Sequence, residues 1–224
     1  LQGQLDSRKT SFSMLSHTLG YWEFCVTVLP RFMRGFVFSL RVFQNMLRQY
    51  KKDQKLWLPR RVRRDIRTIV NILPDVNTTV PIQPRAGRTR SEPACTDACG
   101  GNKAAAAYVT PSGLKWWPFK GKQKKANIAW QEGAAVREYL TDRCCELHGT
   151  IVPIYIDNTT FLGALRNGYS TNSKLNSLVQ QCLLMCFHHE IILDLCYVKS
   201  KANMLADAAS RQMWSTFYDH FSTF

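Results

Sequence analysis

Residues 150–160 read Thr-Ile-Val-Pro-Ile-Tyr-Ile-Asp-Asn-Thr-Thr. The apolar run at 150–156 predicts a buried strand that closes on Asp157. A carboxylate at the end of a buried strand is costly unless it is paired or bound to a metal ion. The pattern recurs in the short strand predicted at 93–99, with Asp97 expected at its carboxyl end. Since ligands of open α/β sheets lie at the carboxyl ends of strands, the two aspartates predict a metal platform. Taken singly, each is equally typical of a turn.

The elements around these strands predict an α/β fold with a mixed sheet. Two strands and a turn follow the first one closely, which is typical of an antiparallel meander. The remaining strands alternate with helices, which is typical of parallel pairing with helices on the faces of the sheet. The further expected strands are 104–110, 114–119 and 191–198, and the expected helices are 128–143, 161–166, 175–187 and 202–211.

Glu132 lies on the apolar side of the helix predicted at 128–143. At about 100° per residue, it shares one face with Ile128, Ala135 and Tyr139, so it points toward the sheet. Glu138 lies on another side and is expected to face solvent. A single carboxylate on an apolar stripe is explained by metal coordination.

Asp207 is the fourth candidate ligand and opens the second turn of the last predicted helix. Alone, it is more typical of an acid that stabilises a helix N-terminus. Four carboxylates together are hard oxygen ligands, which select Mg²⁺ or Mn²⁺. Two such ions about 4 Å apart can activate a water and stabilise the leaving oxygen of a phosphodiester.

In this order the motifs resemble the RNase H domain of retroelement polymerases, with the DIRS and Ngaro group of tyrosine-recombinase retrotransposons as the nearest likeness. The resemblance rests on residues 96–98, Glu132, residues 155–160 and residues 203–211. It implies an RNase H-like mixed five-stranded sheet with flanking helices over 91–212. It also implies an endonuclease that cuts the RNA strand of RNA–DNA hybrids with two Mg²⁺ or Mn²⁺ ions. The implied catalytic and metal-binding residues are Asp97, Glu132, Asp157 and Asp207.

Further residues are candidates for nucleic-acid binding. The resemblance implies that Asn158 helps to position nucleic acid. Cellular relatives carry a histidine before the last acid, and this chain has none there. Lys199 and Lys201 could touch the nucleic-acid backbone instead. Aromatic residues among basic ones suit nucleic acid, and Trp116 and Trp117 precede the basic loop that carries Lys120, Lys122, Lys124 and Lys125.

The N-terminal part predicts helices. Apolar residues three and four apart predict a helical hairpin over 12–47. The segment 1–57 that contains it is similar to a polymerase thumb. We expect the hairpin to dock on a polymerase domain or another protein. A polar stretch at 48–57 reads as a linker. A basic helix and a tether follow at 58–90, and the helix is similar to the one that connects a polymerase to its RNase H domain. Its Arg60, Arg61 and Arg64 are candidates for RNA binding. They could equally form a solvent-exposed face without a ligand. Residues 213–224 are expected to form a tail.

Composition sets the remaining expectations. A formal charge of +14 favours a polyanionic partner, and RNA or an RNA–DNA hybrid is the first candidate. No membrane-spanning segment is expected. Eight cysteines without a C-x-x-C pair predict reduced thiols in an intracellular protein of the nucleus or cytoplasm. A metal cluster of Cys182, Cys186, His188 and His189 is a weaker reading. The chain does not begin with Met, and we expect a piece of something longer.

Two other functions remain open. One is a catalytically silent, domesticated relative that binds RNA or scaffolds a ribonucleoprotein. The other is an integrase or Holliday-junction nuclease, which would share the fold but not the reaction.

Overall fold

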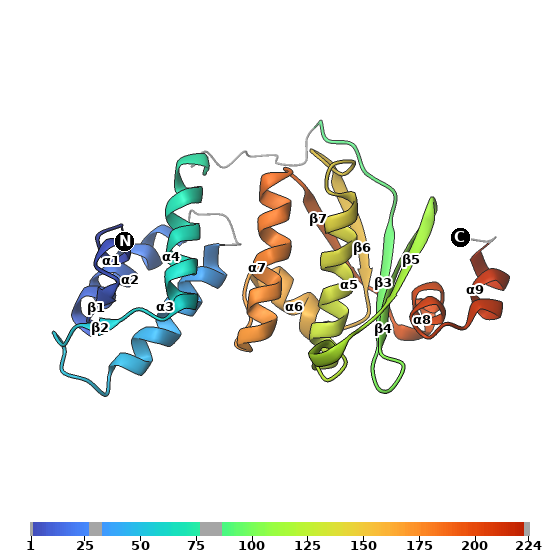
Figure 1. Cartoon of the computed structure of the whole chain (residues 1–224). Coiled ribbons are helices and arrows are strands. Elements are labelled where there is room, and N and C mark those ends of the chain that lie inside the picture. Colours follow the sequence, from blue (N-terminus) through green and yellow to red (C-terminus); the bar gives the residue numbers. More distant parts are fainter. Residues whose placement is uncertain (1, 27–32, 77–86, 222–224) are drawn as a thin grey trace. The chain divides into compact units, whose positions relative to one another are not determined.

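The computed structural model describes residues 2–26, 33–76 and 87–221 and divides the chain into two compact units, Leu1–Pro84 and Arg85–Phe224. Figure 1 shows both units with their elements labelled. The tether expected at 75–92 falls largely on residues 77–86, which lie outside the described residues. Each unit is therefore described by itself.

The N-terminal unit is helical, as the sequence predicts. Helices α2 (Phe12–Val26) and α3 (Met33–Leu47) pack together, and α4 (Arg60–Ile72) packs on α3. Their core includes Leu15, Leu40 and Ile66, each with no exposed surface. A short helix, α1 (Gln2–Ser7), precedes a pair of two-residue strands, β1 (Lys9–Thr10) and β2 (Leu56–Trp57), which are antiparallel. The expected linker at 48–57 thus ends in a strand that ties it to the start of the chain.

Helix α4 begins directly after Pro59 and is strongly two-sided. Its buried face carries Val62, Ile66, Ile69 and Ile72, together with Asp65. Asp65 accepts from Arg64 at 3.4 Å, and burial raises the pKa of the Asp65 carboxyl. Arg60 and Arg64 are exposed, while Arg61 is half-buried.

The C-terminal unit is built on a mixed five-stranded sheet in the order β5-β4-β3-β6-β7. Strands β3 (Ala94–Cys99), β4 (Ala105–Thr110) and β5 (Gly113–Pro118) form the antiparallel meander. Strands β6 (Ile151–Ile156) and β7 (Ile192–Tyr197) continue the sheet in parallel from β3. The five strands and their directions confirm the predicted sheet.

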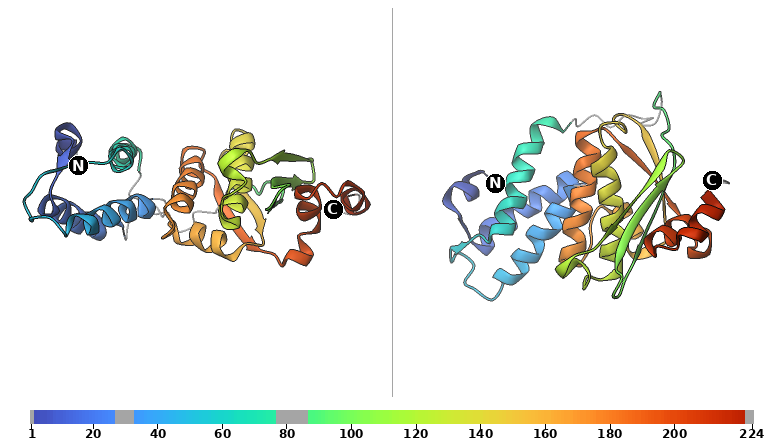
Figure 2. Two further views of the ribbon diagram at one scale, coloured as in Figure 1. Left: turned by 60° about the horizontal axis from the view of Figure 1, so that its bottom comes forward. Right: turned by 45° about the vertical axis from the view of Figure 1, so that its right-hand side comes forward.

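Helices cover both faces of this sheet (Figures 1 and 2). Helices α5 (Ile128–Arg143), α6 (Thr159–Asn167) and α7 (Ser173–His188) lie on one face and share the largest core. Helix α8 (Met204–Ser210) lies on the other face with α9 (Trp214–Phe221), whose Phe217 is buried against it. The expected C-terminal tail therefore contains a packed helix.

Alanines let the helices approach the sheet closely. Strand β4 is buried along its whole length, with Ala106 toward α5 and Ala107 toward α8. Alanines of the two helices meet them: Ala134 and Ala135 from α5, and Ala206 from α8. Such small side chains keep the backbone of α5 and α8 near β3, which is where the carboxylates lie.

Trp116 and Trp117 are both partly buried, on opposite faces of β5. The ring centroids of Trp117 and Tyr108 lie 6.3 Å apart, and those of Trp116 and Trp214 lie 6.4 Å apart. Both rings thus contribute to the cores on the two faces.

No helix among the described residues is long and apolar enough to cross a membrane.

Candidate metal centre

Asp97 lies in the middle strand of the sheet. It is the fourth of the six residues of β3 and pairs with Ala107 of β4, so it does not end the strand as expected from the sequence. The strand continues because β4 supplies hydrogen-bonding partners as far as Cys99. The Asp97 side chain is only 3% exposed.

Asp157 is the first residue after β6. Strands β3 and β6 are parallel, with Cys95 opposite Tyr155. Asp97 and Asp157 each lie two residues further along, which brings their side chains to the same part of the sheet. The next residue, Asn158, uses its side-chain oxygen to accept from Phe161 N at 2.9 Å and so caps α6. The nucleic-acid role implied for Asn158 stays a prediction.

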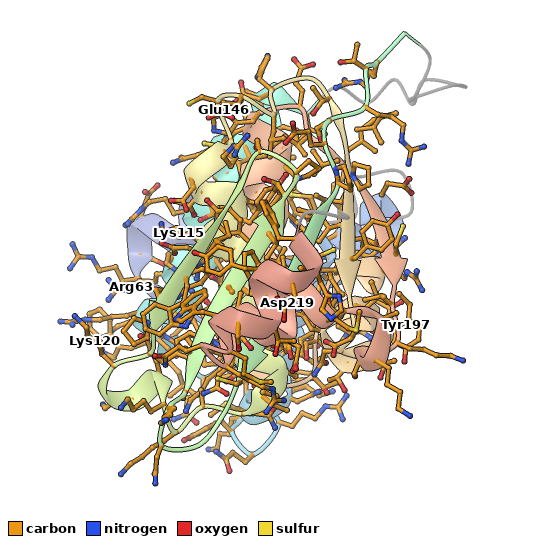
Figure 3. The ribbon with its side chains drawn as sticks, turned by 90° about the vertical axis from the view of Figure 1, so that its right-hand side faces the viewer. Arg63, Lys115, Lys120, Glu146, Tyr197 and Asp219 are labelled. Carbon is orange, nitrogen blue, oxygen red and sulfur yellow. The ribbon has the colours of Figure 1, made fainter. Side chains whose placement is uncertain are left out.

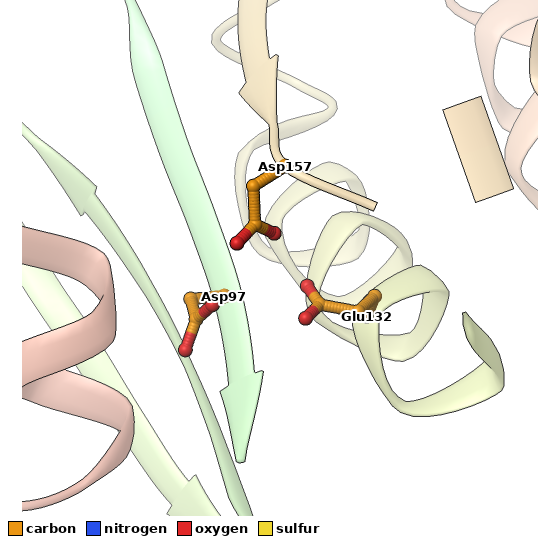
Figure 4. Close-up of side chains that lie close together, drawn as sticks. All are labelled: Asp97, Glu132 and Asp157. Atoms are coloured by element: carbon orange, nitrogen blue, oxygen red, sulfur yellow. The ribbon is translucent and has the colours of Figure 1, made fainter. Parts of the chain in front are cut away.

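Glu132 reaches the two aspartates from α5. The helix starts at Asn127, whose side chain accepts from Ala129 N at 2.8 Å. One turn later Glu132 faces the sheet and is 4% exposed, as its phase on the helix predicts. Figure 4 shows Asp97, Glu132 and Asp157 side by side, one from β3, one from α5 and one from the end of β6. By contrast, Glu138 is half-buried and pairs with Lys115 at 3.3 Å.

The three carboxylates fit a divalent cation. Asp97, Glu132 and Asp157 each offer an oxygen within 4.8 Å of the others. Glu132 Oε2 and Asp157 Oδ1 are buried without a hydrogen-bond partner in the described part of the chain. Buried carboxylate oxygens are costly unless a partner is supplied, and a hard cation is the partner that an all-oxygen donor set selects.

The pKa values show the electrostatic cost of this cluster. Burial raises the pKa of Glu132 to about 10, with further increases from the charges of Asp97 and Asp157 and a decrease from a hydrogen bond with the Ala98 backbone. Burial raises the pKa of Asp97 to about 6, and the hydrogen bond from Ser210 acts in the opposite direction. With a pKa of about 10, Glu132 therefore keeps its proton at neutral pH when no cation is bound.

Asp207 lies beside this group but outside it. It sits in the first turn of α8, with its side chain 38% exposed, and Arg211 Nε donates to its Oδ1 at 2.6 Å. Its charge still contributes to raising the pKa of Asp97, so the two carboxylates are near one another.

Two polar residues of the α8 region contact β3; the sequence places both in the motif at 203–211 but assigns them no role. Asn203 is 2% exposed and donates through Nδ2 to Thr96 O at 3.0 Å, while its Oδ1 has no partner in the described residues. Ser210 is fully buried and donates to Asp97 Oδ2. The available signal was that Asn203 and Ser210 are polar residues flanking an alanine-rich helix that must be buried.

Lysines surround the same end of the sheet. Strands β3, β5, β6 and β7 run in the same direction, so their carboxyl ends share one edge. The loop after β5 carries Lys120, Lys122, Lys124 and Lys125, and the segment after β7 carries Lys199 and Lys201; all six are exposed. Figure 3 shows Lys120 and Tyr197 toward the same end of the unit, away from Glu146.

Gln131 orders the basic loop. Its side chain is 1% exposed and donates from Nε2 to Gln123 O at 3.0 Å and to Lys124 O at 3.3 Å. The loop also contains a short 3-10 helix at Gly121–Gln123. The lysines are thus held next to the helix that carries Glu132.

The remaining candidates lie elsewhere. Arg60, Arg61 and Arg64 belong to the N-terminal unit. Cys182 and Cys186 are buried free thiols, and within the described ranges the metal-compatible group of carboxylates, thiols and imidazoles is Asp97, Glu132 and Asp157.

The strand order and directions define an RNase H-like fold, with Asp97 on its central strand, Asp157 directly after the neighbouring strand and Glu132 on the helix beside them. No family model and no curated protein matches the chain. Among solved structures it is similar to RNase H1 from the archaeon Halobacterium salinarum, at 15% identity and a TM-score of 0.46, over 56% of this chain and 98% of that one.

Two further solved structures are similar. The N-terminal RNase H domain of a Mycobacterium tuberculosis protein matches at 13% identity and a TM-score of 0.45, over 59% of this chain and 98% of that one. A foamy viral protease-reverse transcriptase, designated dRH and solved in complex with double-stranded DNA, matches at 13% identity and a TM-score of 0.34, over 85% of this chain and 32% of that one.

Proposed function

We propose that the C-terminal unit is a ribonuclease H that hydrolyses the RNA strand of RNA–DNA hybrids with two divalent cations. The observation that carries this proposal is the meeting of Asp97, Glu132 and Asp157 within 4.8 Å, with two of their buried oxygens unpartnered. Two buried acids and a half-buried one, none of them in a salt bridge within the described residues, are a costly arrangement for a structural core, and cation binding accounts for it.

Asp97, Glu132 and Asp157 would hold one Mg²⁺ or Mn²⁺ ion, and Asp97 with Asp207 would hold the second. Bound divalent ions supply a water that is acidic enough to attack at neutral pH and stabilise the oxygen that leaves. Asp207 would offer its Oδ2 for this role, since Arg211 contacts its Oδ1. The positive charge of Arg211 beside the carboxylates suits a phosphate.

The lysines at the carboxyl edge of the sheet would hold the substrate. Lys120, Lys122, Lys124 and Lys125 form a preordered basic surface next to α5, which suits a phosphate backbone. Lys199 and Lys201 would contact the backbone near the cleaved bond, in the segment where a histidine is missing. Asn158 would orient the substrate from the N-terminus of α6.

The wider setting is also a proposal. We place the chain within a retroelement polymerase, of the DIRS and Ngaro group by its motifs, and inside the cell, in the nucleus or cytoplasm. The N-terminal segments 1–57 and 58–90 would connect residues 91–212 to a polymerase domain, and the exposed Arg60 and Arg64 on α4, with Arg61, would contact RNA.

A cleavage assay on labelled substrates tests the nuclease. Wild-type protein with Mg²⁺ should cut the RNA of a hybrid and leave RNA duplex, DNA duplex and a four-way DNA junction intact. Asp157→Asn and Glu132→Gln should abolish cleavage. Glu138→Gln is the matched control, because Glu138 lies on the same helix but pairs with Lys115, and it should cleave normally.

The assay also separates the alternatives. Junction cleavage without hybrid cleavage would replace the proposal with a resolvase. An intact hybrid with both Mg²⁺ and Mn²⁺, together with no thermal shift at millimolar Mn²⁺, would favour the silent RNA-binding module.

A further inference from the structure

We propose that Ser210 is a positioning residue for the metal centre: its hydroxyl fixes the Asp97 carboxylate and sets the register of α8, which carries Asp207, on β3. This inference rests on the proposed function of the carboxylate cluster. Ser210 is the last residue of α8 and is fully buried, and its Oγ donates to Asp97 Oδ2.

The single proton of Ser210 has two possible acceptors, and Asp97 is favoured. Ser210 Oγ lies 3.0 Å from Asp207 O, the ordinary back-bond of a helical serine. That carbonyl already accepts from the backbone N of Arg211 at 3.1 Å. An ionised carboxylate is also the stronger acceptor. The hydroxyl therefore bonds across to β3.

The backbone of Ser210 is anchored to the sheet as well. Its carbonyl accepts from Cys99 Sγ at 3.1 Å and from Trp116 Nε1 at 3.4 Å. These contacts do not involve the hydroxyl, so an alanine at position 210 keeps them. The effect of the hydroxyl can thus be separated from the docking of the helix end.

A second contact holds the other end of the helix. Asn203 stands at the N-terminus of α8 without capping it, and its Nδ2 donates to Thr96 O, one residue before Asp97. Helix α8 is thus tied to adjacent residues of β3 from both of its ends. A shift of α8 along the strand would break both bonds, so together they fix where Asp207 stands relative to Asp97.

A side chain that holds a metal ligand affects metal affinity more than fold stability, with losses of about 10–100-fold when it is removed. The test compares the full chain with Ser210→Ala, Ser210→Thr and a matched control, Ser112→Ala. Ser112 is exposed in the turn between β4 and β5, where its hydroxyl contacts Thr110. Mn²⁺ affinity is measured by calorimetry and thermal unfolding is measured in EDTA.

We expect Ser210→Ala to weaken Mn²⁺ binding about tenfold or more and to raise the Mg²⁺ concentration for half-maximal hybrid cleavage. We expect Ser210→Thr, which keeps the hydroxyl but adds a methyl group in a buried site, to unfold at lower temperature yet bind Mn²⁺ more tightly than Ser210→Ala. Ser112→Ala should match wild type.

Two results would overturn the role of Ser210. One is an Mn²⁺ affinity of Ser210→Ala within twofold of wild type, and the other is a folded Ser210→Thr that binds no better than Ser210→Ala. Failure of the proposed function is distinguishable, since the wild-type chain itself would then leave the hybrid intact or bind no Mn²⁺.

Discussion

Gly133 of α5 faces the ring of Phe161 of α6 so closely that no side chain fits between them. A β-carbon at Gly133 would lie 2.5 Å from Phe161 Cε2 and 2.6 Å from Leu178 Cδ2. The glycine follows Glu132 directly, so this close approach of α5 to α6 and α7 also determines how far Glu132 reaches toward the sheet.

Gly133→Ala should therefore destabilise the protein by about 1–3 kcal/mol, the usual cost of overpacking a core. Urea unfolding measures the free energy. Gly163 of α6 is the control, because a β-carbon there would meet nothing within 4 Å. Gly163→Ala should stabilise the protein by about 0.5–1 kcal/mol through helix propensity. A Gly133→Ala protein as stable as wild type would contradict the packing described for α5.

The metal-free protein should lose stability as pH rises from about 5 to 9. The pKa values of Glu132 and Asp97 are about 10 and about 6 in the folded state, against 4.5 and 3.8 as ordinary values. Folding therefore favours the protonated acids, and this contribution is fully present below pH 4 and is lost as pH rises through the folded pKa values. Thermal unfolding in EDTA measures it.

Glu132→Gln isolates that contribution, because the amide cannot ionise. Its unfolding temperature should fall less than that of wild type over the same pH range. With saturating Mn²⁺ the opposite pH dependence is expected. The metal should raise the unfolding temperature of the wild type more than that of Glu132→Gln, and increasingly so as pH rises, because the cation displaces protons from its ligands. Parallel pH profiles for the two proteins in EDTA would mean that Glu132 is ionised before metal arrives.

The basic loop after β5 should contribute to hybrid affinity mainly through charge. Replacing Lys122, Lys124 and Lys125 with alanine should weaken binding and reduce the slope of log affinity against log salt by about 0.9 for each lost phosphate contact. Fluorescence anisotropy at several salt concentrations measures the slope.

A control with the same change in charge is available in the N-terminal unit. Lys51, Lys52 and Lys55 are exposed and lie in the segment between α3 and β2. Their replacement by alanine should leave the slope nearer to the wild-type value. Equal slopes for the two triple variants would indicate that net charge, and not the loop, sets the affinity.

The thiols should differ sharply in reactivity. Cys145 is exposed, whereas Cys182 and Cys186 are buried, and burial raises the pKa of Cys182 to about 12. Since the thiolate is the reactive form, a native-state alkylation mapped by mass spectrometry should modify Cys145 first. Cys182 and Cys186 should react only in denaturant. Early modification of Cys182 would show that α7 opens readily.

The sequence predicted those parts of the site that depend on local pattern. Asp157 was recognised because it closes an apolar strand, and Glu132 because its position on the helix placed it on the apolar face. The strand that carries Asp97 was predicted at 93–99 and spans Ala94–Cys99, but Asp97 lies inside it and not at its end, because pairing with β4 continues to Cys99. Local pattern cannot supply a partner strand.

Long-range contacts account for what was missed. Ser210 and Asn203 contact residues 113 and 107 positions away, at Asp97 and Thr96. Helix α9 looked like a tail because its packing depends on Phe217 meeting α8, and the strands β1 and β2 are each two residues long. Pairings at such separations leave no periodic signal in the chain.

The central place of β3 has a consequence for the order in which the unit can mature. The strand binds β4, which follows it at once, and also β6 and α8, which are synthesised about 50 and 110 residues later. Contacts that distant form late, because loop closure must precede them. In a nascent chain whose α8 is still inside the ribosome, neither Asp207 nor the hydroxyl of Ser210 can reach Asp97. Tight binding of Mn²⁺ would then begin only once α8 has docked on β3.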